Sequence, residues 1–169
     1  MKKAAVIGAG FAGLSSAYFL SEKFQVTLFD QKGIGAGVSG ISSGLLHPYP
    51  GEKGRLSWEA TEAMMLCRKL IQEAEDALGK PVANKGGILR LGPILNPGPD
   101  VTQLGPEKFL ITSGMTVFPS LYLQGLWLAC EKRGVTLKIK KITSLDALQE
   151  YDFVVLTVGA GIRSFKEKE

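Results

Sequence analysis

Three glycines at the spacing GxGxxG restrict the fold of this chain more than any other feature, because of what surrounds them. The apolar run of residues 4–7 is typical of a buried strand, and the glycine motif fills residues 8–13 directly after it. A second apolar run, residues 25–30, ends in Asp30. A glycine triplet is specific only when a strand precedes it, a helix follows it and an acid lies about 20 residues further on. The sequence meets these conditions and predicts a βαβ unit that binds a dinucleotide.

Each part of the motif has its own predicted task. Gly8 permits a tight turn, Gly10 lets the backbone approach a pyrophosphate, and Gly13 lets the helix pack close to the sheet. The free N–H groups and positive dipole end of the helix attract phosphate charge, so Phe11 and Ala12 bind through their backbone.

Asp30 is predicted to accept hydrogen bonds from the ribose hydroxyls of the dinucleotide, and its charge would repel the additional phosphate of NADP. The alternative is an ordinary turn between a strand and a helix, with incidental glycines. The order of strand, turn, helix and strand makes that alternative the weaker one.

Length and composition are those of a globular domain. The chain has 169 residues, enough for one domain with a substantial core. Its formal net charge is +4, and the dispersed lysines and arginines are weak evidence for a nucleic-acid partner. The sequence shows neither a run long enough to cross a bilayer nor the pattern of a signal peptide. We therefore expect a cytoplasmic protein with no membrane partner.

The two cysteines, Cys67 and Cys130, fall on apolar faces of predicted helices, without CxxC spacing or a histidine cluster. We expect them to be buried, reduced thiols and expect no metal site.

Two long helices are predicted after the glycine motif. The first spans Ser57 to Leu78, with Ser57 as its N-cap and Gly79 and Pro81 at its end. The second runs from about Pro119 to Arg133, with Gly134 just past its end. The expected buried stripe of the first helix comprises Ala60, Ala63, Met64, Cys67, Leu70, Ile71, Ala74 and Leu78.

Several short segments are predicted to be strands. Residues 87–91 and 109–112 flank a passage rich in proline and glycine, which indicates an inserted antiparallel layer. Residues 135–139 alternate, and residues 151–157 form the near-continuous apolar run of a buried parallel strand. A second glycine-rich turn, residues 158–161, follows. Because ligands bind at the carboxyl ends of parallel strands, this turn should lie near the first one.

Three segments, taken in order, resemble a known family. They are the glycine motif with Asp30, the loop Val-Ser-Gly-Ile-Ser-Ser-Gly-Leu-Leu-His-Pro at residues 38–48, and the turn at residues 157–161. The chain resembles the N-terminal half of the D-amino-acid oxidase-like FAD-dependent oxidoreductases. This family includes glycine and sarcosine oxidases and the oxidase domain of an enzyme that modifies a wobble uridine in tRNA. The loop is similar to that of the tRNA-modifying domain.

The resemblance implies FAD rather than NAD as the cofactor. The residues it implies at the pyrophosphate are Gly8, Ala9, Gly10, Phe11, Ala12 and Gly13, and those at the adenosine ribose are Asp30, Gln31 and Lys32. The implied flavin-side loop consists of Ser39, Gly40, Ser42, Ser43, Gly44 and Leu45. The adenine is expected at or near Ile139, and the implied closing turn contains Thr157, Gly159 and Ala160.

With this cofactor, the predicted fold class is α/β: a Rossmann-like FAD-binding βαβ fold with a parallel sheet plus part of an antiparallel substrate layer. Residues 1–84 are expected to form the FAD-binding βαβ unit and a helix. Residues 85–118 are expected to form a partial substrate-domain layer, and residues 119–169 to return to the FAD-binding domain.

The resemblance also implies a reaction. Flavins of this family accept a hydride from the carbon next to an amine nitrogen, which gives an imine that water hydrolyses. The expected substrate is a small amine or amino acid. A tRNA substrate is a narrower alternative that the loop favours slightly.

Two departures from the family pattern limit what carries over. Ile41 and Ser42 stand where the family loop usually has an Arg or Asn after its glycine. Family members also run to roughly twice this length, as expected for two-domain enzymes. We therefore expect a truncated form or fragment that lacks the substrate half, and no catalytic residue is assigned.

Two alternatives stay open on the sequence. The chain could be a non-catalytic nucleotide-binding remnant or interaction module, or an NAD-dependent dehydrogenase domain in which the Ser/Gly loop has no obvious task. His47 is the only histidine. We expect it to pack or form a hydrogen bond rather than act as a base or a flavin attachment point.

Overall fold

A sheet of four parallel strands carries the glycine motif in the computed structural model, which describes residues 1–166. The strand order is β10-β1-β2-β9, and Ile7 of β1 pairs with Phe29 of β2 and with Leu156 of β10. The four carboxyl ends therefore meet at one edge, where both glycine turns begin. The bounds are Lys3–Ile7 for β1, Gln25–Asp30 for β2, Thr136–Ile139 for β9 and Phe153–Leu156 for β10.

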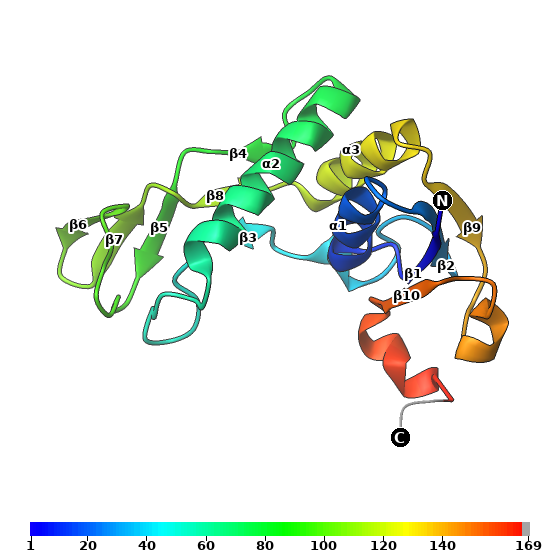
Figure 1. The fold of residues 1–169 in the computed structure, drawn as a ribbon. Coiled ribbons are helices and arrows are strands. Elements are labelled where there is room, and N and C mark those ends of the chain that lie inside the picture. The colour runs from blue at the N-terminus through cyan, green and yellow to red at the C-terminus, as the bar shows by residue number, and fades with distance from the viewer. Residues whose placement is uncertain (167–169) are drawn as a thin grey trace.

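Helices cover one face of this sheet (Figure 1). Helix α1 (Phe11–Leu20) connects β1 to β2 and packs against α3 (Pro119–Lys132), which in turn packs against α2 (Ala60–Leu78). A Cβ on Gly125 of α3 would collide with the backbone of Ala74, so the glycine permits the close approach of α2 and α3. The predicted βαβ unit and both predicted long helices are confirmed.

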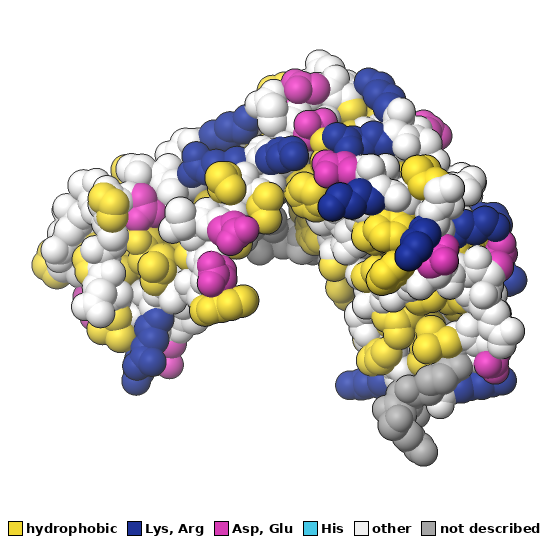
Figure 2. Space-filling model, viewed as in Figure 1, with side chains coloured by type: hydrophobic (Ala, Val, Ile, Leu, Met, Phe, Trp, Pro, Cys, Tyr) yellow, Lys and Arg dark blue, Asp and Glu magenta, His cyan; other side chains and the backbone are white. Residues whose placement is uncertain are grey.

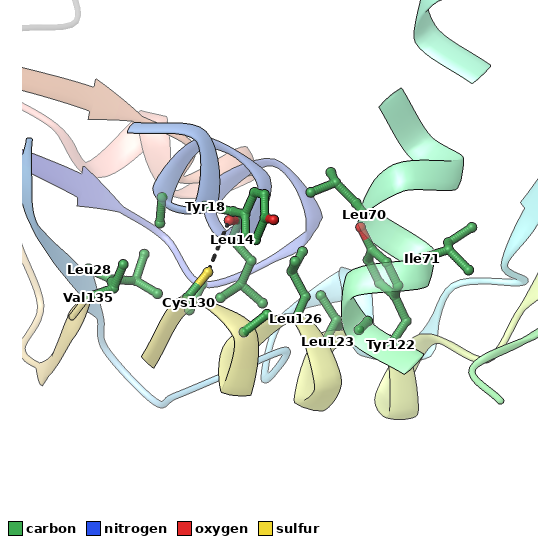
Figure 3. Close-up of a cluster of buried hydrophobic side chains, with 14 of the residues drawn as sticks. Leu14, Tyr18, Leu28, Leu70, Ile71, Tyr122, Leu123, Leu126, Cys130 and Val135 are labelled. Atoms are coloured by element: carbon green, nitrogen blue, oxygen red, sulfur yellow. Dashed lines mark hydrogen bonds between the residues drawn. The ribbon is translucent and has the colours of Figure 1, made fainter. Parts of the chain in front are cut away.

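Alternation along β1 divides its side chains between two cores. Ala4 and Val6 pack against the helices, whereas Ala5 and Ile7 face the opposite side together with Phe29. Figure 3 shows the larger core. Its labelled residues are Leu14 and Tyr18 of α1, Leu70 and Ile71 of α2, Tyr122, Leu123, Leu126 and Cys130 of α3, Leu28 of β2, and Val135.

The smaller core is closed by the C-terminal part of the chain. It includes Ile142, Leu148 and Phe165, which lie in or beside two 3₁₀ helices, Leu145–Leu148 and Gly159–Ser164. This packing fixes the segments that follow β9 and β10 beneath the carboxyl edge of the sheet.

Two antiparallel sheets form the rest of the fold and confirm the predicted antiparallel layer. The sheet β5-β7-β6 lies at the far end of the molecule, and the sheet β3-β8-β4 lies between it and helices α1 and α3 (Figure 1). The sequence predicted β5 and β7 but missed β3, β4, β6 and β8. The bounds are Leu45–Leu46 (β3), Ala83–Asn84 (β4), Ile88–Leu91 (β5), Val101–Gly105 (β6), Lys108–Ile111 (β7) and Met115–Val117 (β8).

Helix α2 begins three residues later than expected. Its N-cap is Glu59, in a left-handed conformation, and the N–H of Ser57 donates instead to the carbonyl of Pro48 at 2.9 Å. The prediction that Ser57 caps the helix was therefore wrong. The predicted stripe is buried at Ala60, Met64, Leu70, Ile71 and Ala74, but Ala63 is exposed and Cys67 and Leu78 are half-buried.

Strand β10 is an edge strand and not the buried strand that its apolar run predicted. It pairs with β1 on one side, and among residues 1–166 no strand pairs with its other side. Phe153 is therefore 50% exposed and Leu156 39% exposed.

The surface is hollowed between the lobe that carries β5, β6 and β7 and the lobe that carries the parallel sheet (Figure 2). The segment between β2 and β3, which contains most of the predicted flavin-side loop, bridges the parallel sheet and the sheet β3-β8-β4 (Figure 1). Within residues 1–166, no helix combines the length and apolar character needed to cross a membrane.

Candidate cofactor-binding site

A pocket of about 380 Å³ opens at the carboxyl ends of the four parallel strands. Sites for small molecules usually measure about 300–1,000 Å³, so this volume is in the expected range. The pocket brings together ten of the residues predicted from the sequence: Gly8, Ala9, Gly10, Asp30, Gln31, Lys32, Ser39, Thr157, Gly159 and Ala160.

The first glycine turn fits too tightly for any other residue at two positions. Gly8 has a φ of +108°, and a Cβ added to it would lie 2.5 Å from the carbonyl oxygen of Thr157. A Cβ on Gly13 would collide with the carbonyl oxygen of Gly8. Gly8 thus makes the turn, and Gly13 lets α1 sit directly on it, as the motif predicts.

The N-terminus of α1 is open to an anion. Gly10 is the N-cap and offers no capping side chain, and the first turn of the helix contains no acid. Phe11 donates its N–H to the hydroxyl oxygen of Ser39 at 3.3 Å, whereas the N–H groups of Ala12 and Gly13 have no acceptor within residues 1–166. A cradle of this kind suits a phosphate group.

Ser39 lies directly above the turn. A Cβ on Gly10 would lie 2.6 Å from its hydroxyl oxygen. The glycine motif and the following Ser/Gly loop, which Phe11 and Ser39 connect across 28 residues of sequence, therefore form one wall of the pocket.

The carboxylate of Asp30 is occupied by backbone groups. Its Oδ2 accepts the N–H of Ala9 at 2.9 Å, and its Oδ1 accepts those of Lys32 and Gly33 at 2.8 and 2.9 Å. Because an ionised carboxylate has about four acceptor positions, one remains for a ligand. Asp30 thus ties the glycine turn to the loop after β2, a role that the motif alone did not predict.

Thr157 joins the second glycine turn to the first. Its hydroxyl lies 2.8 Å from the carbonyl oxygen of Ile7 and 3.0 Å from that of Gly8, and donates to them. Its N–H also donates to Ile7 at 2.9 Å. The expectation that the two glycine turns lie side by side is confirmed.

The flavin-side loop lies mostly outside this pocket. Gly40 lines a second, smaller cavity against α3, and a Cβ on Gly44 would collide with the backbone of Val117 in β8. Leu45 belongs to β3 and pairs with Thr116. The predicted residues that do not line the larger pocket are Phe11, Ala12, Gly13, Gly40, Ser42, Ser43, Gly44, Leu45 and Ile139.

Sequence reasoning expected the adenine at or near Ile139 but named none of the residues that follow β9 as site residues. Ile139 pairs with Asp30 and points to solvent, whereas Lys140, Lys141, Ile142 and Thr143 line the pocket. The signal lay in the fold, because a segment that leaves the carboxyl end of a parallel strand lies at the ligand edge. Other lining residues that were not predicted are Ile7, Phe29, Ala36, Gly37, Val38, Val158, Gly161, Ser164 and Phe165.

His47 has a structural role and lies outside the pocket lining. Its Nδ1 accepts the N–H of Tyr49 at 3.2 Å, as the hydrogen-bonding interpretation predicted. Burial, followed by the nearby Arg90 guanidinium, lowers the pKa of His47 below its usual 6.5. Tyr49 is buried and donates to Asp100 at 2.7 Å, so this network fastens the segment after β3 to the antiparallel sheet.

The two cysteines form no disulfide. Cys67 and Cys130 are both free, and burial raises the pKa of Cys130 to about 12. Cys67 is only half-buried, contrary to the sequence prediction. Among residues 1–166, no cluster of His, Cys, Asp and Glu has the arrangement of a metal site.

The fold and the pocket define an α/β dinucleotide-binding protein. The family model described as "DAO: FAD dependent oxidoreductase" matches residues 3–168, and the chain belongs to this family of FAD-dependent oxidoreductases. The resemblance found in the sequence is thereby confirmed, and the NAD-dependent alternative conflicts with it. No curated protein sequence matches the chain.

Solved structures of oxidases share the fold. Iminodiacetate oxidase from Chelativorans sp. BNC1 is 20% identical, with 82% of this chain and 47% of that chain covered and a TM-score of 0.64. Glycine oxidase from Geobacillus kaustophilus is 16% identical, with 80% and 46% covered and a TM-score of 0.61. NikD, titled an unusual amino acid oxidase essential for nikkomycin biosynthesis, is 16% identical, with 99% and 54% covered and a TM-score of 0.65. The chain thus spans about half the length of these proteins.

Proposed function

We propose that this chain is the FAD-binding part of an oxidoreductase that acts on a small amine or amino acid. The observation that carries the proposal is the joining of the two glycine turns through Thr157 around one pocket, in a chain that belongs to an FAD-dependent family. Bound FAD would supply the acceptor for the hydride from the carbon next to the amine nitrogen.

The residues of the pocket fit the diphosphate half of FAD. Gly8 makes the tight turn, and Gly10 lets Ser39 lie directly above it. The free N–H groups of Ala12 and Gly13 with the dipole of α1 would hold the phosphate charge. Asp30 would accept from the ribose with its remaining acceptor position. Gln31 and Lys32 flank it.

The flavin half is proposed to follow the bridging loop. The loop begins with Ser39, which lines the pocket, and Ser42, Ser43 and Leu45 lie exposed further along the chain. Gly40 and Gly44 give this loop its close packing on Gly35 and Val117, so their proposed contribution is to hold its shape. Gly159, Ala160 and the region beside Ile139 would enclose the adenosine half.

The substrate class rests on the names of the neighbours. These are oxidases of iminodiacetate, glycine and other amino acids, which supports a small amine or amino acid. The names do not support the tRNA alternative, and we do not propose it. The cytoplasmic location stays a prediction from the sequence.

Absorption spectroscopy of the purified chain tests the proposal. We expect the two-band flavin spectrum, either as purified or after addition of FAD and removal of the excess. A colourless chain that takes up no FAD would contradict it. A yellow chain that does not reduce its flavin with glycine, sarcosine or iminodiacetate would favour the non-catalytic alternative.

A further inference from the structure

The charged side chains that line the pocket carry a net positive charge. They are three lysines, Lys32, Lys140 and Lys141, and one acid, Asp30. The lining is therefore left with two positive charges, which match the two negative charges of a dinucleotide diphosphate.

The backbone that carries Lys140 and Lys141 is held in place on both sides. The N–H of Lys140 donates to the carbonyl oxygen of Asp30 at 2.8 Å, and the side chain of Ile142 is buried in the smaller core. Thr143 accepts the N–H of Lys166 at 3.0 Å. The two lysines therefore project from a fixed segment beside the end of β2.

The ammonium groups of Lys140 and Lys141 are available to a ligand. Both side chains are exposed, and neither makes an ion pair or hydrogen bond with any of residues 1–166. Lysines on an edge strand often serve to prevent aggregation. Lys138 on β9 fits that role, and its ammonium lies over the ring of Phe29. Lys140 and Lys141 come after the strand has ended, so edge protection does not explain them.

We propose that Lys140 and Lys141 form a cationic subsite that selects nucleotides by their phosphate charge. This inference rests on the proposed FAD site and adds residues that the glycine motif does not contain. The ligand class is an adenosine diphosphate or a dinucleotide that contains one. The backbone of this segment would contact the adenosine half, whereas the two ammonium groups would act on the phosphate charge, so unphosphorylated adenosine and riboflavin gain nothing from the ammonium groups.

The expected effect is moderate, because the lysines are exposed and salt screens them. Removal of both charges should weaken binding of ADP and FAD about tenfold at low ionic strength. The difference should shrink as the Debye length falls from about 20 Å near 20 mM salt to about 4 Å near 0.5 M salt.

Calorimetric titration of the full chain provides the test, with ADP, FAD, adenosine and riboflavin as probes at low and high salt. At low salt, K140Q/K141Q should bind ADP and FAD about tenfold more weakly than the parent chain, and its affinity for adenosine and riboflavin should be unchanged. K140R/K141R should bind as the parent does. The matched control, K80Q/K108Q, removes two exposed charges outside the pocket and should change nothing.

The possible failures are distinguishable. If K140Q/K141Q binds ADP and FAD as tightly as the parent at low salt, the subsite is refuted and the FAD site stands. Equal losses for adenosine and riboflavin, or losses that persist at high salt, would also refute it, because they indicate a changed pocket shape. If the parent chain binds neither ADP nor FAD, both this inference and the proposed function fail. Thermal unfolding by circular dichroism checks that each variant is folded.

Discussion

The residue types at single positions of the first glycine turn are required by the protein atoms around them, and several of these residues stabilise the fold as well as facing the ligand. A Cβ on Gly13 would collide with the carbonyl oxygen of Gly8, so the fold requires glycine there whatever ligand its N–H binds. Asp30 faces the pocket, yet three backbone N–H groups use most of its acceptor positions. Residues of the binding motif thus stabilise the turn even in the absence of a ligand.

Substitution of Gly13 by alanine is expected to destabilise the chain without any ligand. The added Cβ must displace the carbonyl of Gly8 or the whole of α1, and such overpacking costs about 1–3 kcal/mol. Urea unfolding of G13A measures the loss. G105A is the control, because a Cβ there meets no atom within 4 Å. Equal stabilities of the two variants would show that helix and turn are not in close contact.

Asp30 is expected to stabilise the apo form. D30N replaces one carboxylate oxygen by an amide nitrogen, which leaves one or more backbone N–H groups without an acceptor, at about 1–3 kcal/mol. Unfolding in urea without FAD is the measurement. If D30N were as stable as the parent and lost only FAD affinity, Asp30 would act on the ribose alone.

His47 is expected to make stability depend on pH. Burial, followed by Arg90, holds its folded-state pKa below 6.5, so the folded state favours the neutral ring. The corresponding stability is fully present above pH 6.5 and is lost as pH falls toward the folded pKa. Denaturant midpoints should therefore drop on the acid side of neutrality. The H47N side chain retains an acceptor for the N–H of Tyr49 but cannot titrate. The denaturant midpoint of H47N should therefore fall less on the acid side than that of the parent chain. An unchanged pH profile in H47N would contradict this account.

Elements differ in how well the sequence predicts them, for physical reasons. Helices α2 and α3 and strands β1 and β2 carry enough periodic residues to be recognised alone. Strands β3 and β4 have two residues each and form only because β8 pairs with them, so no local sequence pattern predicts them. The start of α2 shows the reverse effect, since Ser57 has a capping side chain but its backbone is bonded to Pro48.

Strand β10 is expected to cause self-association of this chain. It is an apolar edge strand without a charged residue, whereas the opposite edge strand β9 carries Lys138. Exposed apolar edges pair with other strands. F153K should therefore reduce association, measured by size-exclusion chromatography with light scattering. W58K changes an exposed aromatic outside the sheets and is the control. An equal reduction by W58K would show that association does not depend on the edge.

The site at the scale of the whole molecule combines what the sequence predicted with what only the fold reveals. The two glycine turns were recognisable because each follows its own apolar strand. Lys140 and Lys141 were not, because their place depends on β9 lying beside β2. Ser42, Ser43, Gly44 and Leu45 lie outside the larger pocket, so their flavin contacts stay predictions.

The two turns joined by Thr157 are proposed to bind FAD, and the decisive measurement is an equilibrium titration of the purified chain with FAD. We expect saturable binding that ADP displaces and that G10V abolishes, because the added side chain would collide with the hydroxyl of Ser39 above the turn. Binding that is absent from the parent chain, or unchanged in G10V, would contradict it.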